Sequence, residues 1–493
     1  MSVRVRFAPS PTGWVHIGGL RTALYNYLFA KQQEGTYLLR IEDTDRSRYV
    51  EGAIEGMLNS MEWSGVMHTE GPFIEDGSIT QKGDFGPYIQ SERLDMYKEY
   101  VEVLIDSGKA YYCFCSKERL DSVRADQKAN NETPKYDGHC RENTKEESLK
   151  RIENGEEYVI RLKLPENTNI TFDDLVRGTV TVSTNDLDDQ VLIKTDGFPT
   201  YHMAVIVDDH FMGITHVIRG EEWLPSTPKH VYTYEAFGWD APKYVHLPNI
   251  LNSEKKKLSK RQGDVAVMDF EKKGYIPEAL INYVALLGWS PEDNKEIMSI
   301  DEMIESFTFD RVSKSGGVFD IVKLNWVNSQ YIKAMELSKL TELAKKFFVS
   351  EGILTAEELT TKSEWLNLVV DLSREYVNTL LEMPEFSKSF FSTEVIIEDQ
   401  DARDMVEMEH VPQLLLALRG FVEEVETVDA DFAGTVMKMI QKSTGIKGKN
   451  LFMCARVALT GQCHGPDLVK SLIVLGKETL LKRIDYTLAN NCN

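Results

Sequence analysis

The chain begins with an alternating run that turns through prolines and glycines into a helix-like segment. Val3-Arg4-Val5-Arg6-Phe7 predicts a short strand, and residues 8–13 form the turn before His16, Gly18 and Gly19 at the expected helix start. A helix N-terminus presents unpaired N–H groups and a partial positive charge, and glycines let a ligand approach the backbone. Because His16 adds a side-chain donor there, this pattern predicts a phosphate-binding site.

A second lysine-bearing loop, Lys257-Leu258-Ser259-Lys260-Arg261, lies about half the chain away. Between the two, apolar spacing predicts a helix over 20–28, a buried strand over 37–41 and a helix over 54–61. This β–α–β–α order predicts a parallel sheet covered by helices, with ligands at the carboxyl ends of the strands. We expect further strands of the same sheet at 201–207 and 216–218.

Length and composition limit the class of protein. A chain of 493 residues predicts roughly three to five domains. The start lacks the pattern of a secretory signal, no apolar run approaches the ~20 residues of a membrane span, and six cysteines are too few for a disulfide scaffold. We therefore expect a cytoplasmic protein with no membrane partner. The net charge of −22 argues against a nucleic-acid partner, although local lysine clusters can still bind phosphates.

The rest of the chain divides into an expected insertion and a helical half. Residues 98–200 have their own turns, a polar helix over 117–128 and strand-like stretches at 158–164 and 191–194. The acidic stretch 394–409 is expected to separate two helical modules. Amphipathic stripes predict helices at 337–347, 412–424, 431–441 and 466–487.

Five motifs, in their order and spacing, resemble the signature of glutamyl-tRNA synthetases, the class I aminoacyl-tRNA synthetases specific for glutamate. They lie at 7–19, 40–45, 196–209, 215–220 and 257–261. The likeness covers nearly the whole chain, strongly to about residue 335 and loosely beyond. It implies an α/β fold: a Rossmann-like class I synthetase catalytic domain with an α+β insertion, followed by an all-α anticodon-binding region of two helical modules.

The resemblance also implies where the domains lie. The expected segments are a catalytic Rossmann-like domain in two halves (1–97 and 201–236), an inserted acceptor-stem-binding domain with a candidate zinc site (98–200), a stem-contact domain carrying the 257–261 loop (237–335), and two helical anticodon-binding modules (336–400 and 401–493).

The implied activity is glutamate–tRNA ligation. ATP activates L-glutamate to glutamyl-adenylate, and the glutamyl group passes to the terminal adenosine of tRNA(Glu), releasing AMP and pyrophosphate. By the family's habit, tRNA is required even for activation. Mg²⁺ would bridge phosphate oxygens with few protein ligands. We expect the protein to be a monomer.

Both chemical steps gather negative charge at one phosphorus or carbonyl, so catalysis is mainly positioning and electrostatic stabilisation. The resemblance assigns catalytic roles to His16, Lys257 and Lys260. The implied ATP site consists of His16, Gly18, Gly19, Glu222, Trp223, Lys257, Leu258 and Lys260.

Selection of glutamate requires cations for its carboxylates and an anion for its ammonium group. By similarity, Arg6 and Arg219 bind carboxylate, which suits the two-pronged donor geometry of arginine. Glu42 pairs with the α-amino group. Ser10 and Tyr201 supply hydroxyls. Val205 stands where some relatives carry an asparagine that contacts the substrate.

The expected insertion carries Cys113 and Cys115, followed about twenty residues later by Cys140. Three thiolates and one further donor suit tetrahedral zinc, whereas three reduced cysteines without metal are the alternative. Many relatives place a zinc knuckle here. Tyr136, His139 and Glu142 compete as the fourth ligand, and we favour Tyr136 because some related sites use a tyrosine four residues before the last cysteine.

In the helical half, the family reads the anticodon with two modules. Tyr376 aligns with an arginine by which some members reject tRNA(Gln), so an enzyme that also charges tRNA(Gln) is an alternative. Lys447 and Lys449 are candidates for contact with the RNA backbone, or else residues of a surface loop joining two helices.

Other functions explain less of the sequence. Glutaminyl-tRNA synthetases usually carry a β-barrel C-terminal portion, and the queuosine-modifying relative lacks an anticodon-binding half. A nucleotidyltransferase without an RNA partner does not explain Arg6, Glu42 and Arg219. A non-catalytic RNA-binding paralogue would not need His16 with the two loop lysines.

If the loop lysine supplies charge to the transition state, Lys260→Ala should slow adenylate formation by several orders of magnitude. Its affinity for tRNA should change little. Rapid-quench measurement of adenylate, alongside tRNA binding, checks this; equal losses in both would contradict the role of the loop.

Overall fold

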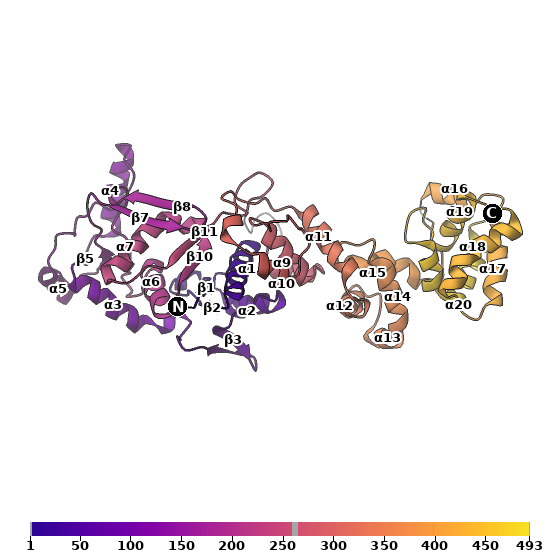
Figure 1. The fold of residues 1–493 in the computed structure, drawn as a ribbon, viewed down its shortest axis with the longest axis horizontal. Coiled ribbons are helices and arrows are strands. Elements are labelled where there is room, and N and C mark those ends of the chain that lie inside the picture. The colour runs from indigo at the N-terminus through magenta and orange to yellow at the C-terminus, as the bar shows by residue number, and fades with distance from the viewer. Residues whose placement is uncertain (1, 259–264, 398, 493) are drawn as a thin grey trace. The chain divides into compact units, whose positions relative to one another are not determined.

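The computed structural model describes residues 2–258, 265–397 and 399–492, which form two compact units (Figure 1). Unit 1 comprises the chain up to Phe270 together with Leu280–Ile321, and unit 2 comprises Glu271–Ala279 and the chain from Val322 onward. Lys260 lies outside the described residues, as do 259 and 261–264. Within the described ranges, no helix has both the length and the apolar character that crossing a membrane requires.

A parallel arrangement of short buried strands forms the centre of unit 1. Strand β1 (Arg4–Phe7) pairs in parallel with β2 (Thr36–Leu39), and β10 (His216–Gly220) pairs in parallel with β11 (Lys243–Leu247). The amide of Thr215 donates to the carbonyl of Arg4 at 2.9 Å, which brings β10 alongside β1. The predicted parallel strands at 37–41 and 216–218 are therefore confirmed.

Strands from the expected insertion extend this arrangement. Strand β7 (Asn169–Asp174) joins β11 in parallel and β8 (Gly178–Ser183) in antiparallel fashion, giving the order β10-β11-β7-β8. A separate antiparallel sheet contains β5 (Ala110–Cys113), β6 (Val159–Leu162) and β9 (Val191–Ile193), so the strands predicted at 158–164 and 191–194 are confirmed. Strands β3 (Gly71–Glu75) and β4 (Ser78–Lys82) form a hairpin.

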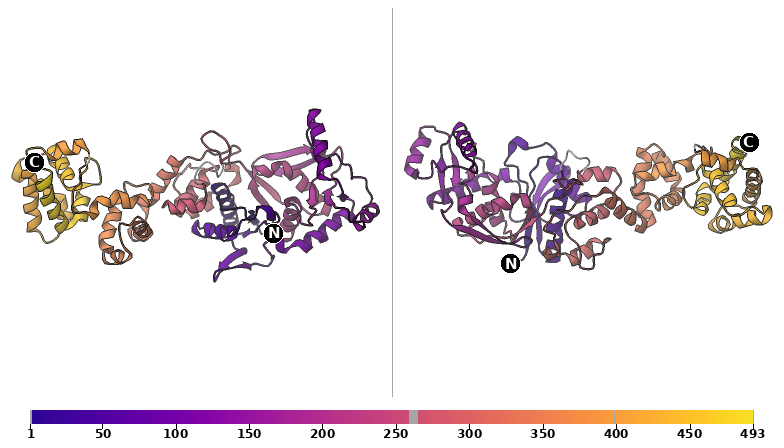
Figure 2. Two further views of the ribbon diagram at one scale, coloured as in Figure 1. Left: turned by 180° about the vertical axis from the view of Figure 1, so that it is seen from behind. Right: turned by 90° about the horizontal axis from the view of Figure 1, so that it is seen from above.

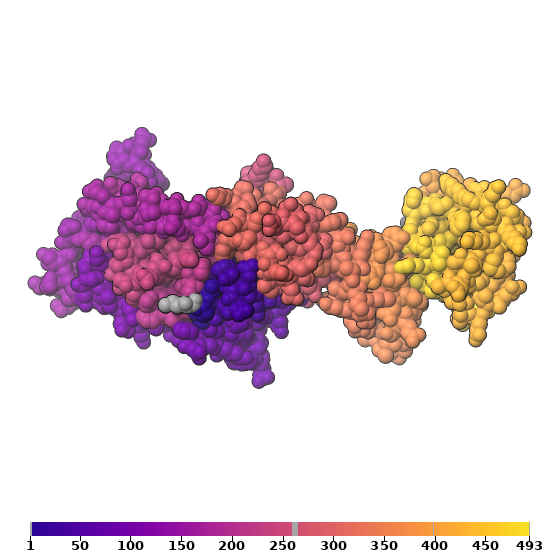
Figure 3. All heavy atoms as spheres, in the orientation of Figure 1, coloured from indigo at the N-terminus to yellow at the C-terminus, as the bar shows by residue number. Residues whose placement is uncertain are grey.

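Helix α1 (Ile17–Gln32) buries one apolar face that includes Leu20, Leu24 and Leu28. It lies beside α10 (Ile300–Ser306), whose Ile304 carbonyl accepts a hydrogen bond from Gln32; Figure 3 shows the indigo surface of α1 bordered by the later, coral segment. The other α-helices wholly within unit 1 are α2 (Ala53–Trp63), α3 (Leu94–Asp106), α4 (Lys117–Ala129), α5 (Lys145–Glu153), α6 (Tyr201–Phe211) and α7 (Thr227–Phe237). The boundaries between the units fall within α8 (Val267–Lys272), α9 (Pro277–Leu286) and α11 (Ile321–Ala334).

The strand predicted at 201–207 is wrong, because these residues begin helix α6 (Tyr201–Phe211). Every residue from Met203 to Asp209 is buried. A helix buried on all sides has no amphipathic stripe, so its apolar run is indistinguishable from that of a buried strand. As a result Asp208 and Asp209 lie on a helix and not at a strand end.

The described part of unit 2 is helical throughout (Figure 2). The helices predicted at 337–347, 412–424 and 431–441 are confirmed. The one predicted at 466–487 corresponds to α20 (Leu468–Asn490), which is kinked at Gly476, where the backbone leaves the helical conformation (φ 66°, ψ 172°). The acidic stretch 394–409 contains α16 (Gln400–Val406), whose Ala402 and Val406 are buried. The helices that follow α11 are α12 (Leu337–Ser350), α13 (Ala356–Thr361), α14 (Ser363–Ser373), α15 (Glu382–Ser387), α16 (Gln400–Val406), α17 (Val411–Glu424), α18 (Ala430–Thr444), α19 (Lys449–Thr460) and α20 (Leu468–Asn490).

Candidate active site

A cavity of about 500 Å³ opens in unit 1 where β1, β10 and β11 end, next to the start of α1. The structure brings together all the predicted ATP- and glutamate-site residues that it describes, and Lys260 is outside the described range. The predicted residues lining the cavity are Arg6, Ser10, His16, Gly18, Gly19, Glu42, Tyr201, Arg219, Glu222, Trp223, Lys257 and Leu258.

The lining of the cavity is cationic although the chain as a whole is acidic. Among its described residues, the cations are Arg6, Arg21, Arg48, Arg219 and Lys257, against two carboxylates, Glu42 and Glu222. A cleft lined by one sign of charge concentrates ligands of the other sign. The local field therefore favours an anionic ligand, despite the net charge of −22.

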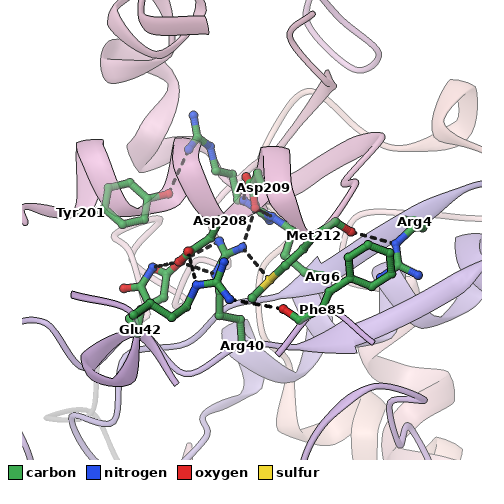
Figure 4. A network of polar contacts seen from close by, with 12 residues as sticks. Arg4, Arg6, Arg40, Glu42, Phe85, Tyr201, Asp208, Asp209 and Met212 are labelled. Atoms are coloured by element: carbon green, nitrogen blue, oxygen red, sulfur yellow. Dashed lines mark hydrogen bonds and ion pairs between the residues drawn. The ribbon is translucent and has the colours of Figure 1, made fainter. Parts of the chain in front are cut away.

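A buried charge network lies behind one wall of the site, to which it contributes Arg6 and Glu42 (Figure 4). Asp209 accepts hydrogen bonds from Arg6 Nε at 3.0 Å and from Arg40 Nη1 at 2.7 Å, and Arg40 Nη2 donates to Glu42 Oε1 at 3.0 Å. Burial alone would raise the pKa of Asp209, but the two guanidiniums outweigh it and hold the pKa below its ordinary value. Asp209 is therefore ionised at neutral pH.

The neighbouring carboxylate, Asp208, is held as firmly. Arg93 Nε donates to it at 2.7 Å, Gln90 Nε2 at 2.8 Å and Tyr97 Oη at 2.9 Å. The described network thus matches three arginines (Arg6, Arg40 and Arg93) with three carboxylates (Glu42, Asp208 and Asp209). No sequence motif singled out Arg93, which precedes α3.

Arg219 has a different environment. The residue is only 5% exposed, and its side-chain partners are Tyr201 Oη at 2.9 Å, Thr227 Oγ1 at 2.9 Å, His246 Nε2 at 3.1 Å and His230 Nδ1 at 3.3 Å. No carboxylate of the described residues forms an ion pair with it. Because a buried cation without an anionic partner is costly, this side chain is prepared for an anion in the cavity.

His16 caps helix α1. Its Nδ1 accepts hydrogen bonds from the amides of Gly18 at 3.0 Å and Gly19 at 3.3 Å, and the Ile17 amide donates to Val265 O. The expectation that this helix start presents unpaired N–H groups is therefore wrong, because the imidazole occupies two of them. Since Nδ1 accepts, the ring proton of His16 resides on Nε2.

Of the remaining predicted ATP-site residues, Glu222 and Trp223 lie in the 3₁₀ helix Glu221–Ser226, and Lys257 and Leu258 lie on a loop. Lys257 Nζ lies 3.8 Å from Glu222 Oε2, and the Leu258 amide donates to Ile250 O at 2.8 Å. The Trp223 ring packs against the Tyr201 ring, with centroids 3.9 Å apart and an angle of 31°. This aromatic pair covers the side of the cavity next to Arg219.

The three predicted cysteines of the insertion converge, with their sulfurs within 4.8 Å of one another. Cys115 and Cys140 are 3.6 Å apart, close to the about 3.8 Å between two sulfurs on one tetrahedral zinc with bonds of about 2.3 Å. Tyr136 Oη lies 3.4 Å from Cys113 Sγ and 3.8 Å from Cys115 Sγ. Glu142, in contrast, is 86% exposed and faces Lys163. The donor set fits zinc, with Tyr136 at the cluster.

The predicted tRNA-contact residues lie in unit 2 and take no part in this cavity. Tyr376 is 47% exposed and stacks on Phe386, with ring centroids 5.2 Å apart. Lys447 and Lys449 are exposed at the turn from α18 to α19.

Comparisons with known proteins follow the same division of the chain. The family model described as tRNA synthetases class I (E and Q), catalytic domain, matches residues 2–326, and a model for an anticodon binding domain matches 339–488. A glutamate–tRNA ligase of Clostridioides difficile is 61% identical over 99% of this chain and 100% of its own, and one of Alkaliphilus metalliredigens is 60% identical over 98% of both. A solved glutamate tRNA ligase from Elizabethkingia meningosepticum, in complex with its amino acid, is 38% identical with a TM-score of 0.88, covering both chains fully.

Breaking the charge network should destabilise unit 1. Arg40→Met leaves Asp209 and Glu42 buried without a shared cation, which typically costs 3–5 kcal/mol, so we expect a loss of about 4 kcal/mol in urea unfolding. Arg124→Met, which breaks an exposed pair with Asp121, serves as the control and should cost less than about 1 kcal/mol. Similar losses in both variants would show that the network has no special role.

Proposed function

The chain belongs to the class I tRNA synthetases for glutamate and glutamine, and we propose that it is a glutamate–tRNA ligase. It activates L-glutamate with ATP and transfers the glutamyl group to the terminal adenosine of tRNA(Glu). The observation that carries this assignment is Arg219, a buried guanidinium in a cavity, surrounded by neutral partners and aligned to receive a carboxylate.

The side-chain carboxylate of glutamate would bind Arg219, beside the hydroxyl of Tyr201. Arg6, whose charge Asp209 already compensates, would add a weaker cationic contribution. At the opposite end of the substrate, Glu42 would receive the ammonium group, and Ser10 would add a hydroxyl. Arginine forks discriminate carboxylate from carboxamide by charge as well as geometry, which favours glutamate over glutamine.

ATP would bind with its phosphates at the start of α1. Because Nδ1 of His16 is engaged with the helix amides, its Nε2–H is the atom that donates to phosphate oxygens as charge develops on phosphorus. Lys257, and Lys260 by the family resemblance, would neutralise the departing pyrophosphate. Mg²⁺, when bound, supplies charge neutralisation between phosphate oxygens. Trp223 would stack near the nucleoside.

Two regions outside the cavity, the insertion and the helical modules of the C-terminal half, would bind RNA. The insertion around the cysteine cluster would hold the acceptor stem, with a structural zinc on Cys113, Cys115, Cys140 and Tyr136. The helical modules would bind the anticodon, where exposed aromatic and basic side chains such as Tyr376, Lys447 and Lys449 suit stacking and phosphate contact.

Aminoacylation of purified tRNA(Glu) and tRNA(Gln), each with glutamate and with glutamine, tests the function. We expect glutamyl-tRNA(Glu) and no glutaminyl product. Charging of tRNA(Gln) with glutamate would establish the broader, non-discriminating activity. Absence of product with tRNA(Glu) and glutamate would refute the proposal.

Removing the uncompensated guanidinium should weaken glutamate binding selectively. Arg219→Ala deletes a charge-assisted contact of roughly 1.5–3 kcal/mol, so the KM for glutamate should rise about 10- to 150-fold while the KM for ATP stays within about twofold. Steady-state aminoacylation measures both constants. A normal glutamate KM in the variant would exclude Arg219 from the pocket.

Metal analysis of the purified protein should give about one zinc per chain. Cys113→Ser should lose this metal because it removes one of three converging thiolates, whereas Cys463→Ser, outside the cluster, should keep it. A fully active, stable protein without metal would leave the cysteines as reduced thiols.

A further inference from the structure

Behind the cavity, three neighbouring strands contribute one polar side chain each. Arg219 on β10 stands opposite His246 on β11 in the strand register, and β11 pairs at Tyr244 with Asp174, the last residue of β7. All three side chains are buried, and neither His246 nor Asp174 lines the cavity. They form a row that begins at the proposed glutamate site and leads away from it.

The hydrogen bonds in this row fix the protonation of the imidazole. His246 Nε2 lies 3.1 Å from Arg219 Nε and 3.0 Å from Thr227 Oγ1. A guanidinium can only donate, so Nε2 accepts from Arg219, and the Thr227 hydroxyl can donate to the same nitrogen. The ring proton therefore resides on Nδ1, which lies 2.6 Å from Asp174 Oδ2. Burial lowers the pKa of His246, which agrees with a neutral ring.

Asp174 is itself held by the backbone. Its Oδ1 accepts from the amides of Val176 at 2.9 Å and Arg177 at 2.7 Å, and its Oδ2 accepts from the amide of His246 at 3.0 Å. These bonds leave the carboxylate one orientation. An aspartate fixed in this way selects one tautomer of the histidine and one rotation of its ring.

The remaining contacts of Arg219 complete its orientation. Thr227 and His230, both on α7, accept from Nη2, while Nη1 donates to Tyr201, which lines the cavity. With His246 on Nε, the planar group has only one allowed rotation. Asp174 does not pair with Arg219, because the imidazole of His246 lies between them, so the face that a substrate carboxylate needs has no carboxylate of Asp174 on it.

We propose that Asp174 and His246 are positioning residues for glutamate recognition: the aspartate fixes the histidine tautomer, and the histidine aims Arg219 into the cavity. The inference rests on the proposed function and names residues outside the cavity that set its specificity. Neither residue touches substrate, and each acts through Arg219.

The first test is Asp174→Asn. A carboxamide can donate to His246 Nδ1, which would move the ring proton to Nε2 and set two donors, Nε2–H and Arg219 Nε–H, against each other. We expect the KM for glutamate to rise about tenfold or more, with the KM for ATP and kcat at saturating glutamate within about twofold. Asp173→Asn, the neighbouring exposed residue on β7, is the matched control and should behave as wild type.

The second test separates positioning from mere structural support. In His246→Gln, the amide oxygen can accept from Arg219 Nε without any tautomer to select, so the glutamate KM should stay within about threefold of wild type. His246→Leu offers no acceptor and should raise the KM about tenfold or more. Adding Asp174→Asn to the His246→Gln variant should raise its glutamate KM little further. His216→Gln, on strand β10 and outside the cavity lining, is the control for the substitution itself.

Several outcomes would overturn the inference. A normal glutamate KM in Asp174→Asn would do so. The inference would also fail if Asp174→Asn raised the glutamate KM by the same factor in the wild-type protein and in the His246→Gln variant. An equal increase would mark a purely structural effect of the substitution. If Asp174→Asn does not fold, the His246→Gln and His246→Leu variants still decide, and equal KM values in those two would refute the proposal.

Long-range ¹H–¹⁵N spectra of the wild-type histidines give an independent readout of the tautomer. We expect the ring proton of His246 on Nδ1, and a proton on Nε2 would refute the inference. Wild-type protein that does not glutamylate tRNA(Glu) would instead refute the proposed function.

Discussion

The shared carboxylate of Asp209 is the interaction on which the architecture of the site depends. It lies on α6 and binds Arg6 from β1 and Arg40 from the end of β2, so one buried group ties together a helix and two strands. A buried charge requires a partner at hydrogen-bond distance, and removing either side leaves the other uncompensated. The spacing of these elements is therefore fixed by charge pairing as well as by apolar packing. Glu42, bonded to the same Arg40, takes its place at the cavity from this constraint.

The site contains arginines of two kinds. Arg6 and Arg40 are neutralised by carboxylates of the protein, and their fixed geometry gives them a structural role, Arg6 in the wall of the cavity and Arg40 behind it. Among the described residues, Arg219 donates hydrogen bonds to hydroxyls and to neutral imidazoles, and its guanidinium lies 5.7 Å from the ring centre of Tyr244. A protein carboxylate at Arg219 would compete with an acidic substrate, whereas hydroxyl and imidazole acceptors fix the orientation of the group and leave its charge available. The contrast explains how the cavity can be both rigid and receptive to an anion.

Much of this site is predictable from sequence because its residues follow strand ends within short motifs. His16 stands out in the residue pattern itself, whereas Arg6, Glu42 and Arg219 are assigned by resemblance to the family, and all four line one cavity. The errors have physical causes. Helix α6 is buried on all sides and lacks the periodicity that separates helix from strand. The amides of Gly18 and Gly19 are capped by a histidine, which only the local geometry reveals. Asp174, His246 and Arg93 carry no local signal, because their importance arises from pairing between distant segments.

The sheet order also changes how the insertion is understood. Sequence patterns mark 98–200 as a separate module, and its cysteine cluster and three-stranded sheet fit that view. Strand β7, however, comes from the same interval and lies beside β11, where Asp174 bonds both the backbone and the ring of His246. One strand of the expected insertion, β7, is therefore part of the same sheet as β10 and β11. Since Arg219 is oriented through that strand, the insertion contributes to the amino-acid site through hydrogen bonds within the sheet, without placing one of these side chains in the cavity.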